Sequence, residues 1–148
     1  MPANSIPRFT RVGKVSSTTV TAANTKSDGS GTIGTDTFLA FTADSTNGSF
    51  VERVRWLATA TASTATTATV ARVYISSVTS GATTSANTYL VAEVTLPSVT
   101  ADSSSAAVQP IDVPLGISVP ASYTVLVQCY AAPAANTAWR ATVFGGDY

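Results

Sequence analysis

The chain has 148 residues, a length typical of one domain, with eight basic side chains, eight acidic ones, no His and one Cys. Charged residues make up 11% of the sequence, less than half of the usual ~25%. A formal net charge of zero, with Lys and Arg scattered, argues against nucleic-acid binding, which needs a basic surface.

Apolar and polar side chains alternate with a period of two along most of the chain, and no window shows the helical period of 3.6. In chain order, the expected strands are 14–22 as an edge strand, 37–43, 50–62, 66–77, 88–96, 107–119, 122–131 and 137–144. Stretches rich in Gly, Asn, Ser and Pro separate them. Because Pro110 and Pro114 cannot donate a ladder hydrogen bond, 107–119 is predicted to be an edge strand or a bulged strand.

The alternation also predicts which side chains are buried. In 50–62, one face carries Val54, Trp56, Ala58 and Ala60. In 88–96, the inward side chains are Leu90, Ala92, Val94 and Leu96, and the outward ones are Tyr89, Val91, Glu93 and Thr95. We expect Trp56 and Trp139 in the core.

About seven or eight strands with regular turns and no helix between them predict an all-β fold. The length suits an antiparallel β-sandwich, either jelly-roll or immunoglobulin-like. Residues 1–32 are small, polar and proline-marked, so we predict a flexible N-terminal arm over 1–32 and a single β-sandwich domain over 33–148.

The sequence offers little for catalysis or metal binding. Cys129 lies in an apolar stretch and is expected to be a buried hydrophobe, without a His partner to activate it. The acidic residues mostly stand in turn-like stretches, where Asp caps turns. The glycine-rich stretch 27–35 lacks a following helix and a phosphate-binding Lys, so it is interpreted as a flexible loop. We therefore predict no enzyme activity, no cofactor, no metal and no small-molecule ligand.

Several strands are apolar on both faces, as at Val70/Ala71, Val91/Ala92 and Leu126/Val127. Strands of this kind are covered on both faces. In so small a domain we expect the second cover to be another subunit. No run of about 20 apolar residues exists for a membrane span, and the N-terminus lacks an apolar signal core, so synthesis in a cytoplasm is expected.

Strand-and-turn features over residues 50–148 resemble small virion proteins of tailed bacteriophages. The first is a strand of the form R-x-[YF]-[IV], followed by a loop Asn and a strand ending E-x-x-[LV]-P. The second is a strand of the form [LI]-P-[AP]-G-Y-x-[LV]. The matching residues are Arg72, Tyr74, Ile75, Asn87, Glu93, Pro97, Val119, Pro120, Ala121 and Tyr123. Ser122 stands where the pattern has Gly, so the sequence leaves undecided whether the tight turn forms there.

The resemblance implies a structural subunit on the surface of a phage capsid, made in the host cytoplasm, which decorates or cements the shell. Its implied partners are the major capsid protein and copies of itself, as a homotrimer. The candidate interface residues are Arg8, Phe9, Arg11, Tyr74 and Tyr148. The alternative is a tail or head-fibre component that binds a receptor or glycan through exposed tyrosines. The candidates for that role are Tyr74, Tyr89, Tyr130 and Tyr148.

Overall fold

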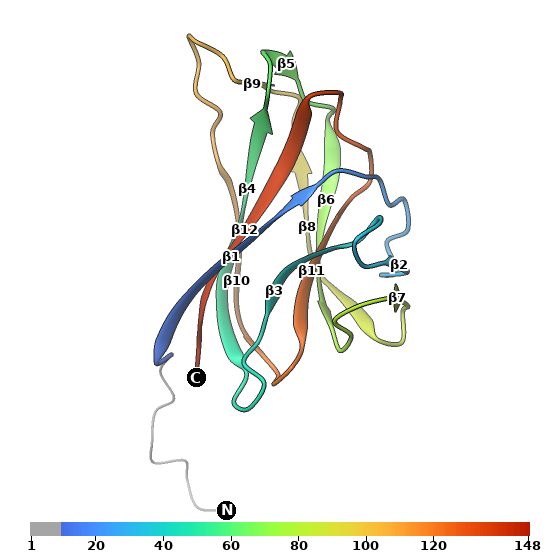
Figure 1. Cartoon of the computed structure of the whole chain (residues 1–148), viewed down its shortest axis with the longest axis vertical. Helices are drawn as coiled ribbons and strands as arrows, with labels where there is room; N and C mark the ends of the chain where they lie inside the picture. Colours follow the sequence, from blue (N-terminus) through green and yellow to red (C-terminus); the bar gives the residue numbers. More distant parts are fainter. Residues whose placement is uncertain (1–9) are drawn as a thin grey trace, which may run out of the picture.

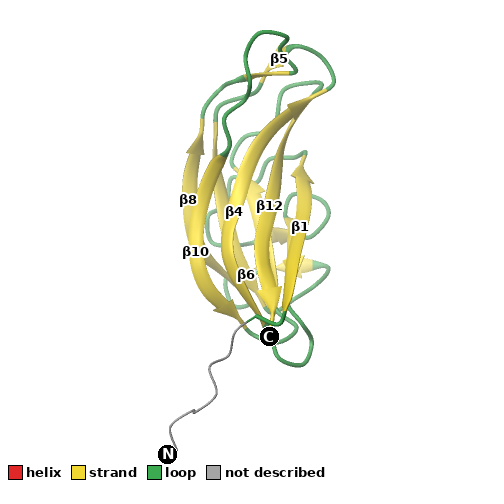
Figure 2. Cartoon of the chain, turned by 90° about the vertical axis from the view of Figure 1, so that its left-hand side faces the viewer, coloured by secondary structure: helices red, strands yellow, loops and turns green. Residues whose placement is uncertain are grey.

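The computed structural model describes residues 10–148, which fold into two four-stranded antiparallel sheets packed face to face (Figures 1 and 2). One sheet has the order β1-β12-β4-β10 and the other β3-β11-β6-β8, and two-residue strands form the pairs β2–β7 and β5–β9. The strands are β1 (Val12–Val20), β2 (Gly31–Thr32), β3 (Phe38–Thr42), β4 (Ser49–Ala60), β5 (Thr64–Ala65), β6 (Thr69–Ser76), β7 (Ala82–Thr83), β8 (Thr88–Leu96), β9 (Thr100–Ala101), β10 (Ile111–Val119), β11 (Thr124–Cys129) and β12 (Thr137–Asp147). None of these residues forms a helix long and apolar enough to cross a membrane.

The pairing of the long strands has the nested order of a jelly roll. The first long strand pairs with the last (β1–β12), the second with the second last (β3–β11), and the series continues inward through β4–β10 and β6–β8. An antiparallel ribbon paired in this way rolls into two facing sheets of four strands. The predicted all-β sandwich is confirmed, and the strand order is that of the jelly-roll alternative.

The core lies between the two sheets and follows the predicted alternation. In β4, Val54 and Trp56 are fully buried and Ala58 nearly so. Trp139 of β12 is 1% exposed, so both tryptophans are core residues as predicted. Cys129 of β11 is also fully buried among apolar side chains, as expected for a small hydrophobe.

A bulge in β8 overturns the predicted orientation of Leu90. Val73 pairs with Ala92, but the next residue of β6, Tyr74, pairs with Leu90, so Val91 is an extra residue. An extra residue shifts the alternation beyond it. Leu90 is therefore 42% exposed instead of inward, and Val91 is 40% exposed beside it.

Two proline-bearing segments behave in different ways. Strand β10 is an edge strand and also bulged, because its register with β4 shifts between Pro114 and Ile117, as the sequence predicts. At the β10–β11 connection the tight turn does form, and the Tyr123 N–H donates to the Pro120 carbonyl at 3.1 Å. Ser122 occupies the left-handed region there, with φ of 66°, in place of the glycine of the pattern.

The edge strand predicted over 14–22 is present in the structure as β1, inside the segment for which we predict an arm over 1–32. Val12–Val20 forms β1, which pairs without interruption along β12, from Val12 opposite Asp147 to Val20 opposite Trp139. This edge strand joins the sandwich because Val20 is fully buried in the core. Residues 1–9 lie outside the described residues, and for them the arm stays a prediction.

Candidate functional site: the apolar sheet edges

The central strands β6 and β11 are covered on both faces by the chain itself. On the face turned away from the core, Arg72 donates from Nη1 to the carbonyls of Asn24, at 3.2 Å, and Lys26, at 3.3 Å. The Tyr74 hydroxyl donates to the Ser27 carbonyl at 3.4 Å.

This cover extends over β11, where Gln128 Nε2 donates to Thr37 Oγ1 at 2.7 Å. Leu126 and Gln128 are both fully buried. The expectation that another subunit covers this face is therefore wrong for β6 and β11. Residues 24–37 provide the cover, because their backbone carbonyls and the Thr37 hydroxyl accept hydrogen bonds from the side chains of Arg72, Tyr74 and Gln128.

Arg72 is the centre of this polar layer. Its guanidinium is largely buried and can only donate hydrogen bonds, so it needs acceptors around it. Besides the two carbonyls, its Nε donates to Glu93 Oε1 on the neighbouring strand at 2.8 Å. The ring of Tyr130 lies 5.7 Å from the guanidinium carbon. Burial raises the pKa of Tyr74 to about 12, so this hydroxyl stays protonated. The segment interpreted as a flexible loop is thus fastened to the sheet.

The acidic side chains of the described residues serve local structure. Asp44 accepts the backbone N–H groups of Asn47, at 2.7 Å, and Thr46, at 3.0 Å, and these bonds lower its pKa. Asp112 receives two hydrogen bonds from Arg55, at 2.7 and 2.8 Å. Burial raises the pKa of the Cys129 thiol to about 12, which keeps it neutral. Within residues 10–148, no three His, Cys, Asp or Glu side chains come together to hold a metal ion.

Exposed large apolar side chains gather on two edge strands. On β1, Val12 is 61% and Val15 63% exposed. On β8, Tyr89, Leu90 and Val91 are each 40–49% exposed. We call these the β1 edge (Val12 and Val15) and the β8 edge (Tyr89, Leu90 and Val91). They belong to different sheets and lie on opposite sides of the sandwich, with β8 next to β10 on one side and β1 on the other (Figure 2).

The other two sheet edges are protected against partners. Strand β10 carries Pro114 and a bulge, and β3 is five residues long with a shift in its register to β11. Proline, bulges and short length are the usual ways of blunting an edge strand. Strand β8 also carries a bulge, at Val91. The β1 strand has none of these features, since it contains no proline and its register with β12 is continuous over nine residues.

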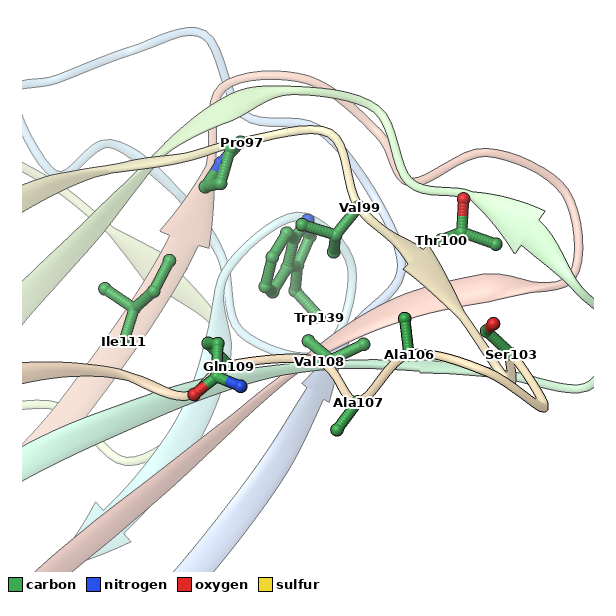
Figure 3. A pocket seen from close by; sticks show the side chains of 10 residues that line it. All are labelled: Pro97, Val99, Thr100, Ser103, Ala106, Ala107, Val108, Gln109, Ile111 and Trp139. Atoms are coloured by element: carbon green, nitrogen blue, oxygen red, sulfur yellow. The ribbon is translucent and has the colours of Figure 1, made fainter.

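A pocket of about 430 Å³ is lined by residues that include Thr100 of β9. The β5–β9 pair lies at one end of the sandwich (Figure 1). The wall of the pocket is largely aliphatic, with Val99, Val108 and Ile111 gathered around the ring of Trp139 (Figure 3). No charged side chain lines this pocket. It suits an apolar group, and it offers no ion pair to orient one.

Among the predicted interface residues that the structure describes, Arg11 and Tyr148 lie close together and Tyr74 lies apart from them. Arg8 and Phe9 lie outside the described residues. Arg11 is exposed, and its N–H donates to the carbonyl of Asp147, which places it next to Tyr148. Tyr148 is half-buried, with its hydroxyl 2.6 Å from Ser118 Oγ.

Tyr74 is fully buried, and this corrects its assignment to an interface and to a glycan site. It lies on a central strand under residues 24–37, so no partner reaches its side chain. Tyr89 and Tyr130 are half exposed. They stand apart along β6, since Tyr89 pairs with Ile75 and Tyr130 bonds to Val70. Five residues of strand separate these positions, or roughly 17 Å.

Sequence reasoning predicted an edge strand over 14–22, but it did not single out the exposed Val12 and Val15 or the outward orientation of Leu90. The β1 residues fell within the predicted arm, and a period-two pattern carries no mark of a bulge.

No protein-family model matches the chain, and no curated protein does. Among solved structures, it is similar to a chain described as "Cyanophage Pam1 capsid asymmetric unit". The identity is 19%, the alignment covers 98% of each chain, and the TM-score is 0.40. A similarity at this level identifies neither a family nor a function for the present chain.

Proposed function

We propose that this chain is a non-enzymatic structural subunit of a phage particle, which binds the capsid shell and stabilises it as a decoration or cement subunit. The observation that carries the proposal is the exposure of apolar side chains on the β1 and β8 edges of a sandwich whose central strands are otherwise closed. Exposed apolar groups that gather on particular strands suit association with other proteins.

The resemblance to small virion proteins supports the proposal, because residues of the shared pattern join strands or close a turn in this fold. Arg72 and Glu93 join β6 to β8 through an ion pair. Pro120 and Tyr123 close the turn between β10 and β11. The jelly roll recurs in viral capsid domains, although fold alone does not establish function.

Stabilisation follows from preferential binding. A subunit that binds the assembled shell, and not the free capsid protein, shifts the equilibrium toward the shell by about 2.7 kcal/mol per site at 100 times its Kd. We propose the major capsid protein as the partner, with Arg8, Phe9, Arg11 and Tyr148 in the contact. In this arrangement the subunit is a homotrimer on the outer capsid surface.

The test is co-sedimentation of the purified chain with emptied capsids of the phage that encodes it, followed by measurement of their thermal and osmotic tolerance. We expect binding and increased tolerance. Arg11→Ala should weaken binding, whereas the matched control Arg140→Ala, which removes an exposed arginine from β12, should not. Absence of binding to shells, with binding to tail structures, would overturn the capsid assignment.

The alternative, a fibre component that binds a receptor or glycan, draws on the half-exposed rings of Tyr89 and Tyr130. Sugars stack on such rings. A glycan array separates the two proposals, because a hit weakened by Tyr130→Ala or Tyr89→Ala favours the fibre component, and an array without hits removes it.

A further inference from the structure

We propose that the pocket beside Trp139 binds a small neutral apolar molecule that carries a carbonyl or ether oxygen, with the Trp139 indole N–H as the donor to that oxygen. This ligand site goes beyond the proposed function, and it requires no capsid. It departs from the sequence-based prediction of no small-molecule ligand, because the pocket is assembled from residues 97–111 and Trp139, which are far apart in the chain.

The size and lining of the pocket suit a small apolar molecule. Its volume of about 430 Å³ lies within the roughly 300–1,000 Å³ that is typical of small-molecule sites. Val99, Val108 and Ile111 stand around the indole ring (Figure 3), and they also pack against the hydrophobic core. None of the lining residues is charged, so an ion that entered would lose its hydration without gaining a charged partner. The pocket therefore favours a neutral ligand.

The indole N–H of Trp139 lacks a hydrogen-bond partner. Trp139 is 1% exposed, and its Nε1 meets no acceptor in the described part of the chain. Buried polar groups are normally paired, and an indole N–H can only donate. A ligand oxygen would supply the missing acceptor, which a pure hydrocarbon cannot do. Trp56 Nε1 is also buried and unpartnered, but Trp56 does not line the pocket, so it provides an internal control.

The two walls of the pocket are held in different ways, which gives a ligand a route in. Val99 is fastened to Thr66, whose N–H donates to the Val99 carbonyl at 2.8 Å and whose Oγ1 accepts the Val99 N–H at 3.0 Å. Residues 103–109, by contrast, form hydrogen bonds within residues 10–148 only between Ser103 and Ser105. A segment with so few bonds opens at low cost. Its opening lets a ligand oxygen approach the shielded N–H of Trp139.

The test uses two probes of similar shape, 2-acetylnaphthalene, which has a ketone oxygen, and 2-ethylnaphthalene, which has none. Each probe is titrated into the whole chain while NMR follows the two indole N–H resonances. We expect both probes to bind. The ketone should shift the Trp139 N–H resonance further downfield than the hydrocarbon does, because only the ketone accepts its proton. The Trp56 resonance should respond equally to the two probes.

Two pairs of variants locate the contact. Trp139→Phe keeps an aromatic ring but has no donor, so it should weaken binding of the ketone at least about fivefold more than binding of the hydrocarbon, because the ketone oxygen is left unpaired. The matched control Trp56→Phe should change the binding of both probes equally. Val108→Trp should fill the pocket and abolish binding of both probes. Ser104→Trp adds the same ring to the same loop outside the lining residues, and should not affect binding.

Three results would overturn the inference: a wild type that binds neither probe, a Trp139 resonance that shifts alike with ketone and hydrocarbon, or a Trp139→Phe variant that weakens both probes equally. Retained binding in Val108→Trp would place the ligand elsewhere and overturn it as well. The resonance shift is measured on the wild type, so the inference stays testable if a variant fails to fold. None of these results depends on binding to capsids.

Discussion

Replacing Arg72 by Met should destabilise the chain through the cover on β6, not through lost packing. Met keeps an aliphatic side chain of similar length but cannot donate a hydrogen bond. The change removes the donor to the carbonyls of Asn24 and Lys26 and the partner of Glu93. The 24–30 segment then loses its attachment to the central strand.

The magnitude comes mostly from the Asn24 carbonyl. Asn24 is 4% exposed, and an unsatisfied buried carbonyl costs about 1–3 kcal/mol. Lys26 is exposed, so water can replace much of its lost bond. The Glu93 side chain is 46% exposed, and its ion pair is discounted to about 0.5 kcal/mol because solvent screens it. We expect Arg72→Met to cost about 3 kcal/mol in total.

The assay is urea unfolding at pH 7, with hydrogen exchange at the amides of residues 24–30. Arg72→Met should lower the free energy of unfolding and speed exchange in that segment. Glu93→Gln is the matched control, because it removes the ion pair but leaves both carbonyl bonds, and should cost about 0.5 kcal/mol. Arg72→Lys should fall between them, since an ammonium keeps the charge without the planar fork.

If Arg72→Met and Glu93→Gln have equal effects, the carbonyl bonds contribute nothing and the argument for an anchored cover is refuted. Unchanged exchange at 24–30 alongside a large loss of stability would likewise place the effect elsewhere.

Three further predictions concern the backbone and the buried ionisable groups. Ser122→Gly should stabilise the chain by up to about 1 kcal/mol, because Ser122 holds a φ of 66° that glycine adopts freely, and a lower midpoint in thermal unfolding would contradict this. Gly145→Ala should lower the free energy of unfolding in urea by at least about 2 kcal/mol, because the added Cβ would clash with the Phe50 carbonyl oxygen. The control Gly13→Ala should be nearly neutral in the same measurement, because a Cβ there has nothing within 4 Å. Burial raises the pKa of Tyr74 from 10.0 to about 12 and that of Cys129 from 9.0 to about 12. The unfolded chain therefore loses these protons at a lower pH than the folded chain does. The contribution of the two groups to the free energy of unfolding is present below pH 9 and is lost as the pH rises toward 12. Unfolding curves between pH 7 and 11 test this, and Cys129→Ala should flatten the decline; a stability that does not fall with pH would contradict it.

The amino-acid sequence by itself determines the fold class and much of the core. Alternation is a local property of a strand, so Trp56, Trp139 and Cys129 are assigned to the interior without knowledge of the neighbouring strands. Pro114 likewise marks β10 as an edge or bulged strand, because proline has no N–H to donate to a neighbouring strand, whatever the rest of the fold.

Only the tertiary structure decides which strands pair and what covers them. The jelly-roll order depends on contacts between residues far apart in the chain, such as β1 with β12. The single extra residue at Val91 turns Leu90 outward, because side chains alternate and one inserted residue reverses the faces beyond it. The cover on β6 and β11 comes from residues 24–37, since the carbonyls that Arg72 needs become available only when that segment crosses the sheet.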